Sequence, residues 1–149
     1  MNIGSGQFVY MAMNQDRPYL VKIGHTQNPI DRERTLFSAG EPEPYHMLHI
    51  WEVHDMLYVE EGVIHPWLDV ARNFYGKEIF HLDHIYPNMV DPEIWDTVNG
   101  LNLANQLAQD IDAYLTQRNI AYRKVWIYEA EQLDATIREG KKLPKGGHY

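Results

Sequence analysis

The sequence predicts an α+β fold in which three strands and several helices follow one another along the chain. Gln7–Met13 and Tyr19–Gly24 are rich in β-branched and aromatic residues, and the polar turn between them ends in Pro18, which predicts a hairpin. His46–Val53 alternates between two faces as a third strand would. Asn102–Arg118 places its apolar residues at helical spacing, so we expect helices to dominate the second half of the chain.

We predict the helix boundaries from capping residues. A short helix should follow the hairpin, because Thr26 or Asn28 can cap it and Pro29 fits its first position. We expect this helix to stop at Gly40.

A longer helix should begin at Asp55, and Pro66 within it predicts a kink or a junction between two helices. Another should begin at Asp91-Pro92 and break at Asn99-Gly100, before the helix over residues 102–118. Ala121–Tyr128 fits either a strand or the start of a helix.

Composition narrows the classes of protein to which the chain can belong. Its 149 residues suit one compact domain, or one domain with a helical appendage. There is no cysteine, which excludes disulfides, thiolate nucleophiles and cysteine-based zinc sites. No apolar run is long enough to span a bilayer, so we expect no membrane association and a cytoplasmic location. The formal charge of −8 argues against a non-specific nucleic-acid coat but leaves room for a local basic site.

Four polar side chains lie near the hairpin and the following helix start: Tyr10, Lys22, His25 and Arg32. A phosphate-cleaving site needs a group that orients or deprotonates water, and cations that stabilise the phosphorane. A tyrosine can orient water, and an arginine can hold two phosphate oxygens through its planar guanidinium. Spacing alone favours the ordinary alternative, in which these are a strand tyrosine covering a helix, an exposed lysine and a surface arginine.

Glu61 and His65 are four residues apart on a predicted helix and should therefore share a face, while Glu60 should lie on another face in solvent. An inward carboxylate suits Mg²⁺, and a nearby histidine could orient it or act on the leaving group. By spacing alone, a solvated pair is the simpler alternative. A second ligand-like segment, His81-Leu82-Asp83-His84, is half of a zinc pattern without a matching second pair.

Taken together, these segments resemble the GIY-YIG nuclease superfamily, in the branch of small phage and bacterial proteins whose second motif reads KIG. Five motifs occur in the family's order across residues 6–82. They are Phe8-Val9-Tyr10, Lys22-Ile23-Gly24-His25-Thr26, Pro29-Ile30-Asp31-Arg32, Glu61-Gly62-Val63-Ile64-His65 and Lys77-Glu78-Ile79-Phe80.

The resemblance implies a small three-stranded, mainly antiparallel sheet flanked by helices. We therefore expect a nuclease-like domain over residues 1–82 and a C-terminal helical extension over residues 83–149, with residues 141–149 disordered. The extension could join two copies of the chain as a homodimer.

The resemblance also implies a DNA endonuclease that hydrolyses phosphodiester bonds with Mg²⁺ or Mn²⁺. Tyr10 would orient or activate water, Arg32 would stabilise the transition state and Glu61 would hold the metal. His25 falls where relatives often carry a lysine near phosphate, so we expect it to contact DNA. Lys22 and His65 complete the expected catalytic set.

Two departures from the family pattern leave other functions open. Phe8 stands where the first motif has glycine, and Lys22 stands where the second motif has tyrosine. One alternative is therefore a catalytically altered, DNA- or protein-binding regulatory module on the same fold. Another is an acidic interaction protein that mimics DNA, which would need a contiguous carboxylate face.

Overall fold

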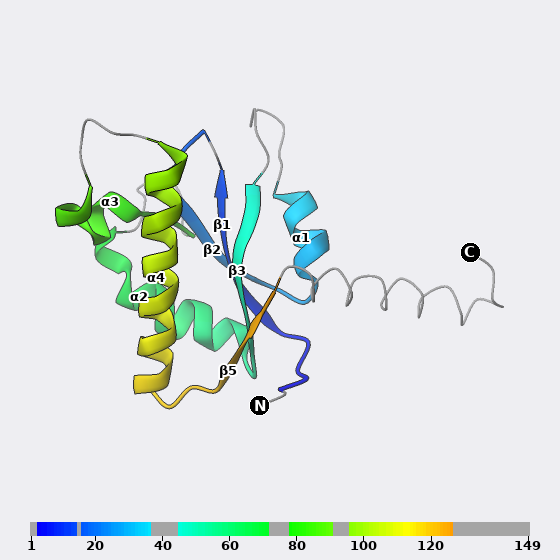
Figure 1. Cartoon of the computed structure of the whole chain (residues 1–149). Helices are drawn as coiled ribbons and strands as arrows, with labels where there is room; N and C mark the ends of the chain where they lie inside the picture. Colours follow the sequence, from blue (N-terminus) through cyan, green and yellow to red (C-terminus); the bar gives the residue numbers. More distant parts are fainter. Residues whose placement is uncertain (1–2, 15, 37–44, 72–77, 91–95, 127–149) are drawn as a thin grey trace, which may run out of the picture.

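The computed structural model describes residues 3–14, 16–36, 45–71, 78–90 and 96–126. Their strands form a five-stranded antiparallel sheet in the order β4-β2-β1-β3-β5 (Figure 1). The strands are β1 (Phe8–Asn14), β2 (Leu20–Thr26), β3 (Tyr45–Val53), β4 (Ile79–His81) and β5 (Tyr122–Val125). The α+β class is confirmed, whereas the predicted count of three strands is wrong.

The two additional strands lie at the edges of the sheet. β4 has three residues and β5 has four, which is too short for a sequence pattern to show alternation. β4 is held by its pairing with β2, and β5 by its pairing with β3. These edge strands depend on partners that are distant in the sequence, so local propensity alone does not place them in the sheet.

The predicted hairpin is present and forms the centre of the sheet. All seven residues of β1 are buried, and β1 pairs with β2 on one side and β3 on the other. In the turn, the Asn14 side chain accepts a hydrogen bond from the backbone N–H of Asp16 at 2.8 Å. This local bond is the reason that an asparagine favours the turn.

Helix α1 (Pro29–Thr35) begins as predicted. The Asn28 side chain accepts a bond from the backbone N–H of Asp31 at 3.2 Å, and Pro29 occupies the first position. α1 ends at Thr35, and the predicted stop at Gly40 lies outside the described residues.

The segment after β3 consists of three short helices of different kinds. They are the π-helix η1 (Tyr58–Ile64), the α-helix α2 (His65–Trp67) and the 3₁₀-helix η2 (Asp69–Ala71). Pro66 is the second residue of α2 and has no N–H with which to continue the hydrogen-bond ladder of η1. It marks a junction between helices, as predicted.

After β4 come α3 (Leu82–Ile85), the 3₁₀-helix η3 (Pro87–Met89) and the long helix α4 (Thr97–Gln117). The predicted break at Asn99-Gly100 is wrong, because α4 passes through both residues without interruption. Gly100 instead allows α4 to pack closely against the hairpin turn. A Cβ at this position would lie 2.0 Å from the carbonyl oxygen of Pro18, in the hairpin turn.

Helices cover both faces of the sheet (Figure 1). On one face, Val9, Met11, Ile23 and Trp51 belong to a core that includes buried residues of η1 and α4. On the other face, a smaller core joins Phe8 and Tyr10 to α1. The sequence correctly predicts the apolar side of α4, which contributes Leu103, Ala104, Leu107, Ala108, Ile111 and Leu115 to the larger core.

The C-terminal part of the described chain thus shares its core and its sheet with the N-terminal strands. The Trp51 indole on β3 also donates a hydrogen bond to Asp112 on α4, at 2.6 Å. The expectation of disorder over residues 141–149 lies outside the described residues. Within the described ranges, no helix combines the length and apolar character needed to cross a bilayer.

Candidate active site

The predicted site residues come from both faces of the sheet and meet around one end of β2. Residues along a strand point alternately to opposite faces. Tyr10 belongs to the smaller core beside α1, whereas His25 contacts Glu60 of η1 on the face covered by the larger core. Within the described residues, the β2–β4 pairing ends at Lys22, with one further backbone hydrogen bond from Ile23 to Glu78, so β2 has no neighbour on this side from Gly24 onward. Side chains from the two faces can therefore approach one another around this edge.

Tyr10 and Arg32 form the first half of the site. Arg32 Nε donates a hydrogen bond to the Tyr10 hydroxyl at 3.3 Å. Gly24 lies opposite Tyr10 in the β1–β2 register, and a Cβ at Gly24 would lie 2.5 Å from that hydroxyl. The glycine of the KIG segment therefore leaves the space in which the tyrosine ring lies.

Burial raises the pKa of Tyr10, and the guanidinium of Arg32 only partly opposes this shift. The phenol is therefore neutral near pH 7. The bond to Tyr10 raises the pKa of Arg32, so this side chain is a permanent cation. Since Arg32 donates, the tyrosine accepts with a lone pair, and its own O–H proton remains to orient another group.

Glu60 forms the second half of the site. It is 0 % exposed, and its Oε2 lies 2.8 Å from His25 Nδ1. His65 Nε2 lies 3.8 Å from the other oxygen, Oε1. His65 Nε2 is 3.0 Å from the Ile23 carbonyl, and because a carbonyl only accepts, this nitrogen carries the proton.

The structure reverses the predicted faces of Glu60 and Glu61. Glu60 is buried, and Glu61 is exposed. The prediction assumed α-helical spacing, in which residues four apart share a face. A π-helix closes i→i+5 bonds instead, and the His65 N–H indeed bonds to the Glu60 carbonyl. Residues five apart therefore align, which places Glu60 above His65.

A negative charge on the Glu60 carboxylate is energetically unfavourable in this buried position. Burial raises its pKa to about 7, and the carboxylates of Glu78 and Glu61 add to the shift, while His25 opposes it. One oxygen, Oε1, is buried without a hydrogen-bond partner among the described residues. A carboxylate held in this state would be stabilised by a cation.

Glu78 connects the two halves of the site. Its carboxylate lies 3.7 Å from Lys22 Nζ, and its backbone carbonyl accepts the Ile23 N–H at 2.9 Å. One ligand atom each from His25, Glu60 and Glu78 can lie within 4.8 Å of the others. Two carboxylates and an imidazole around an unsatisfied oxygen match the donors of a divalent cation, so these residues fit a metal.

Residues 7–99 match the model of a family described as the T5orf172 domain. The chain belongs to the T5orf172 domain family. This phage-associated domain is related to GIY-YIG and nuclease-like folds. No curated protein and no solved structure matches the chain.

The T5orf172 match includes every residue of the candidate site and extends beyond residue 82 to the first residues of α4. The structure brings together five of the predicted site residues: Tyr10, Lys22, His25, Arg32 and His65. Glu61 lies outside the buried cluster.

Sequence reasoning missed two carboxylates of the candidate site, Glu60 and Glu78. Glu78 had a signal, because it stands in the Glu-aromatic segment before β4. In the structure the aromatic residue of that segment, Phe80, packs against the His65 ring at 5.1 Å between centroids. For Glu60 the five-residue spacing to His65 was available in the sequence, but it has meaning only once the helix is known to be a π-helix.

Proposed function

We propose that this T5orf172 protein is a divalent-metal-dependent DNA endonuclease of the GIY-YIG type, which hydrolyses phosphodiester bonds. One observation carries the proposal. The Tyr10–Arg32 pair and the buried Glu60, with His25 and Glu78, lie around the same end of β2. A water-orienting phenol, a fixed cation and a metal-binding carboxylate set are the groups that phosphodiester hydrolysis requires.

In this proposal Tyr10 and Arg32 act as a unit on the scissile phosphate. The Tyr10 O–H orients the attacking water, because its lone pair is already engaged by Arg32. The remaining guanidinium N–H groups of Arg32 face the charge that develops on the phosphate oxygens. A neutral phenol suits orientation better than proton abstraction, which agrees with its raised pKa.

His25, Glu60 and Glu78 would hold Mg²⁺ or Mn²⁺. A bound ion would supply Lewis-acid stabilisation of the charge on the phosphate. We assign the metal-holding carboxylate to Glu60 rather than Glu61, because Glu60 is the buried one. The imidazole of His25 makes Mn²⁺ a better fit than Mg²⁺, which prefers oxygen ligands.

Lys22 and His65 have supporting roles. Lys22 Nζ lies 3.7 Å from Glu78, so it orients that carboxylate and brings a positive charge beside DNA. His65 is fixed by the Ile23 carbonyl and lies beneath Glu60. We therefore infer that His65 positions Glu60, rather than acting on the leaving group.

Matched variants of two adjacent glutamates test the proposal. Purified protein is incubated with plasmid and single-stranded DNA in Mg²⁺ or Mn²⁺. Glu60→Gln should lower the cleavage rate by at least 100-fold, whereas Glu61→Gln should change it less than threefold, since Glu61 is exposed. Equal cleavage by wild type and Glu60→Gln would contradict the assignment.

The same experiment distinguishes the endonuclease from the alternative function. A regulatory module on this fold would bind DNA or a protein without cleaving DNA under any metal condition. DNA binding by the wild type in a mobility-shift assay, together with no cleavage in either metal, would favour that alternative over the endonuclease.

A further inference from the structure

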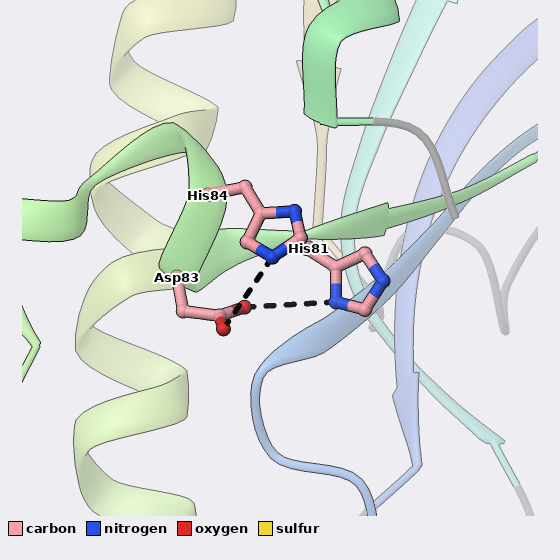
Figure 2. Close-up of side chains that lie close together, drawn as sticks. All are labelled: His81, Asp83 and His84. Carbon is pink, nitrogen blue, oxygen red and sulfur yellow. Dashed lines mark ion pairs between the residues drawn. The ribbon is translucent and has the colours of Figure 1, made fainter. Parts of the chain in front are cut away.

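A second group of metal-ligating side chains lies at the other end of β4. His81 is the last residue of β4, and Asp83 and His84 belong to the first turn of α3. Figure 2 shows both imidazole rings beside the Asp83 carboxylate. β4 pairs with β2 from Leu20↔His81 to Lys22↔Ile79, so this group and Glu78 are separated by the length of the strand.

The distances within the group are close to those of a metal site. His81 Nδ1 lies 3.7 Å from one Asp83 oxygen, and His84 Nε2 lies 4.0 Å from the other. In a tetrahedral site with bonds of about 2.0–2.1 Å, neighbouring ligand atoms are roughly 3.4 Å apart. The two histidine nitrogens would need to approach the carboxylate by about 0.3 and 0.6 Å. The His84 side chain, which is 56 % exposed, has room to make this adjustment.

Two further observations distinguish the group from an ordinary surface cluster. Asp83 Oδ1 is buried without a hydrogen-bond partner among the described residues, although a buried carboxylate oxygen is costly to leave unsatisfied. The two imidazole rings stack with centroids 4.3 Å apart. One nitrogen of each stacked ring lies within 4.0 Å of the Asp83 carboxylate (Figure 2).

The group also lines a cavity of about 460 Å³ between the β1–β2 turn and the start of α3. The rest of its lining comes from Asp16, Arg17, Pro18, Tyr19 and Leu20. Three protein ligands leave at least one coordination position of a bound metal open, and such an open position is typical of metals that bind an exogenous ligand.

We propose that His81, Asp83 and His84 form a binding site for a divalent transition metal of the Zn²⁺ class. Two imidazoles and one carboxylate favour Zn²⁺, Co²⁺ or Ni²⁺ over Mg²⁺ and Ca²⁺, which take oxygen ligands. The site is independent of the proposed nuclease centre. It bridges the end of β4 to the start of α3, so its occupation should also stabilise this connection.

Zinc titration of the full-length chain by calorimetry tests the proposal, after treatment with a chelator and dialysis. The Glu60→Gln protein serves as the background, because this variant weakens the other candidate metal site. We expect one bound Zn²⁺ per chain. Asp83→Asn or His84→Ala, each added to this background, should weaken the affinity by at least tenfold.

His54→Ala is the matched control, because His54 is an exposed histidine outside the group, and it should leave the affinity unchanged. Co²⁺ should give visible absorption bands that Asp83→Asn removes. Circular dichroism shows that each variant is folded, so loss of binding is not loss of structure. The proposal is overturned if the Glu60→Gln background binds no Zn²⁺, or if Asp83→Asn and His84→Ala bind it as tightly as that background.

Discussion

Glu60 and Glu61 are chain neighbours with the same side chain, yet η1 places one in the core and the other in solvent. The consequence is chemical as well as geometric. Burial raises the pKa of the Glu60 carboxyl to about 7, and one of its oxygens has no hydrogen-bond partner among the described residues. At the scale of single residues, the candidate site is therefore defined by burial rather than by residue type.

The raised pKa of Glu60 predicts a pH-dependent stability of the metal-free protein. The folded state keeps the proton up to pH about 7, whereas the unfolded chain releases it near 4.5. Between these values the folded state binds more protons, so the free energy of unfolding should fall as pH rises through this window, by roughly 1–3 kcal/mol. Urea unfolding at pH 5 and pH 8 in chelator measures the change.

Glu60→Gln should remove this component and make the protein more stable than wild type at pH 8. Glu61→Gln is the control and should retain the wild-type fall. The pKa of Glu60 also depends on the charges of His25, Glu78 and Glu61. Comparing the Glu60→Gln and Glu61→Gln variants therefore assigns the pH dependence to Glu60 itself. An identical pH dependence in wild type and Glu60→Gln would refute the assignment.

Tyr10→Phe should separate activity from stability. The change removes the hydroxyl that Arg32 contacts at 3.3 Å but keeps the buried ring. We expect the free energy of unfolding to change by about 1 kcal/mol or less, and DNA cleavage to fall by roughly 100-fold or more. Parallel urea unfolding and plasmid-cleavage rates measure both effects; an active Tyr10→Phe protein would exclude the hydroxyl from the reaction.

At the scale of elements, two helices differ from their predicted forms for physical reasons. η1 is a π-helix, and α4 continues through Gly100. Glycine usually weakens a helix interior, but here the missing side chain allows α4 to approach the turn that carries Pro18. In both cases a tertiary contact outweighs local preference.

Gly100→Ala should therefore destabilise the protein, although the same change stabilises most helices by up to about 1 kcal/mol. The added Cβ would lie 2.0 Å from the Pro18 carbonyl oxygen and 2.8 Å from its carbon. Because these are backbone atoms, α4 or the turn must move, and we expect a loss of roughly 1–3 kcal/mol.

Gly62→Ala is the matched control for this change. Its Cβ would meet the side chain of Tyr58 at 3.1 Å, and Tyr58 is exposed and can move. Urea unfolding of both variants measures the difference. A Gly100→Ala protein as stable as wild type would show that the approach of α4 to Pro18 has no energetic consequence.

At the scale of the whole molecule, the described chain contains one larger core that joins distant parts of the sequence. Leu107 and Ile111 of α4 lie in the same cluster as Val9 and Ile23 of the central strands. β5 also completes the sheet beside β3. The predicted domain boundary at residue 82 can therefore be tested by measuring whether the chain unfolds in one cooperative transition.

Leu107→Ala should destabilise the N-terminal strands together with α4. We expect one unfolding transition, shifted by roughly 2–5 kcal/mol, when it is followed both by far-UV circular dichroism and by tryptophan fluorescence. Trp51, one of four tryptophans, lies buried in β3 and contributes a signal from the sheet. Gln109→Ala on the exposed side of α4 is the control. Two separate transitions would instead support independent folding of residues 1–82.

Much of the fold follows from local sequence. The hairpin, the third strand, the Asn28 cap and the apolar side of α4 each depend on residues close together in the chain. The prediction that Tyr10, Lys22, His25 and Arg32 lie near the hairpin and the following helix start came from the same local elements. DNA as the partner, Mg²⁺ or Mn²⁺ as the cofactor, a homodimer and a cytoplasmic location stay predictions.

The sequence by itself determined the central strands and the residue types that a phosphodiester-cleaving site needs, because β-propensity, turn chemistry and caps act over a few residues. Only the tertiary structure decided that β4 and β5 join the sheet, that α4 passes through Gly100 and that Glu60 rather than Glu61 is buried. These outcomes depend on pairing and close packing between segments far apart in the chain, and no local pattern contains that information.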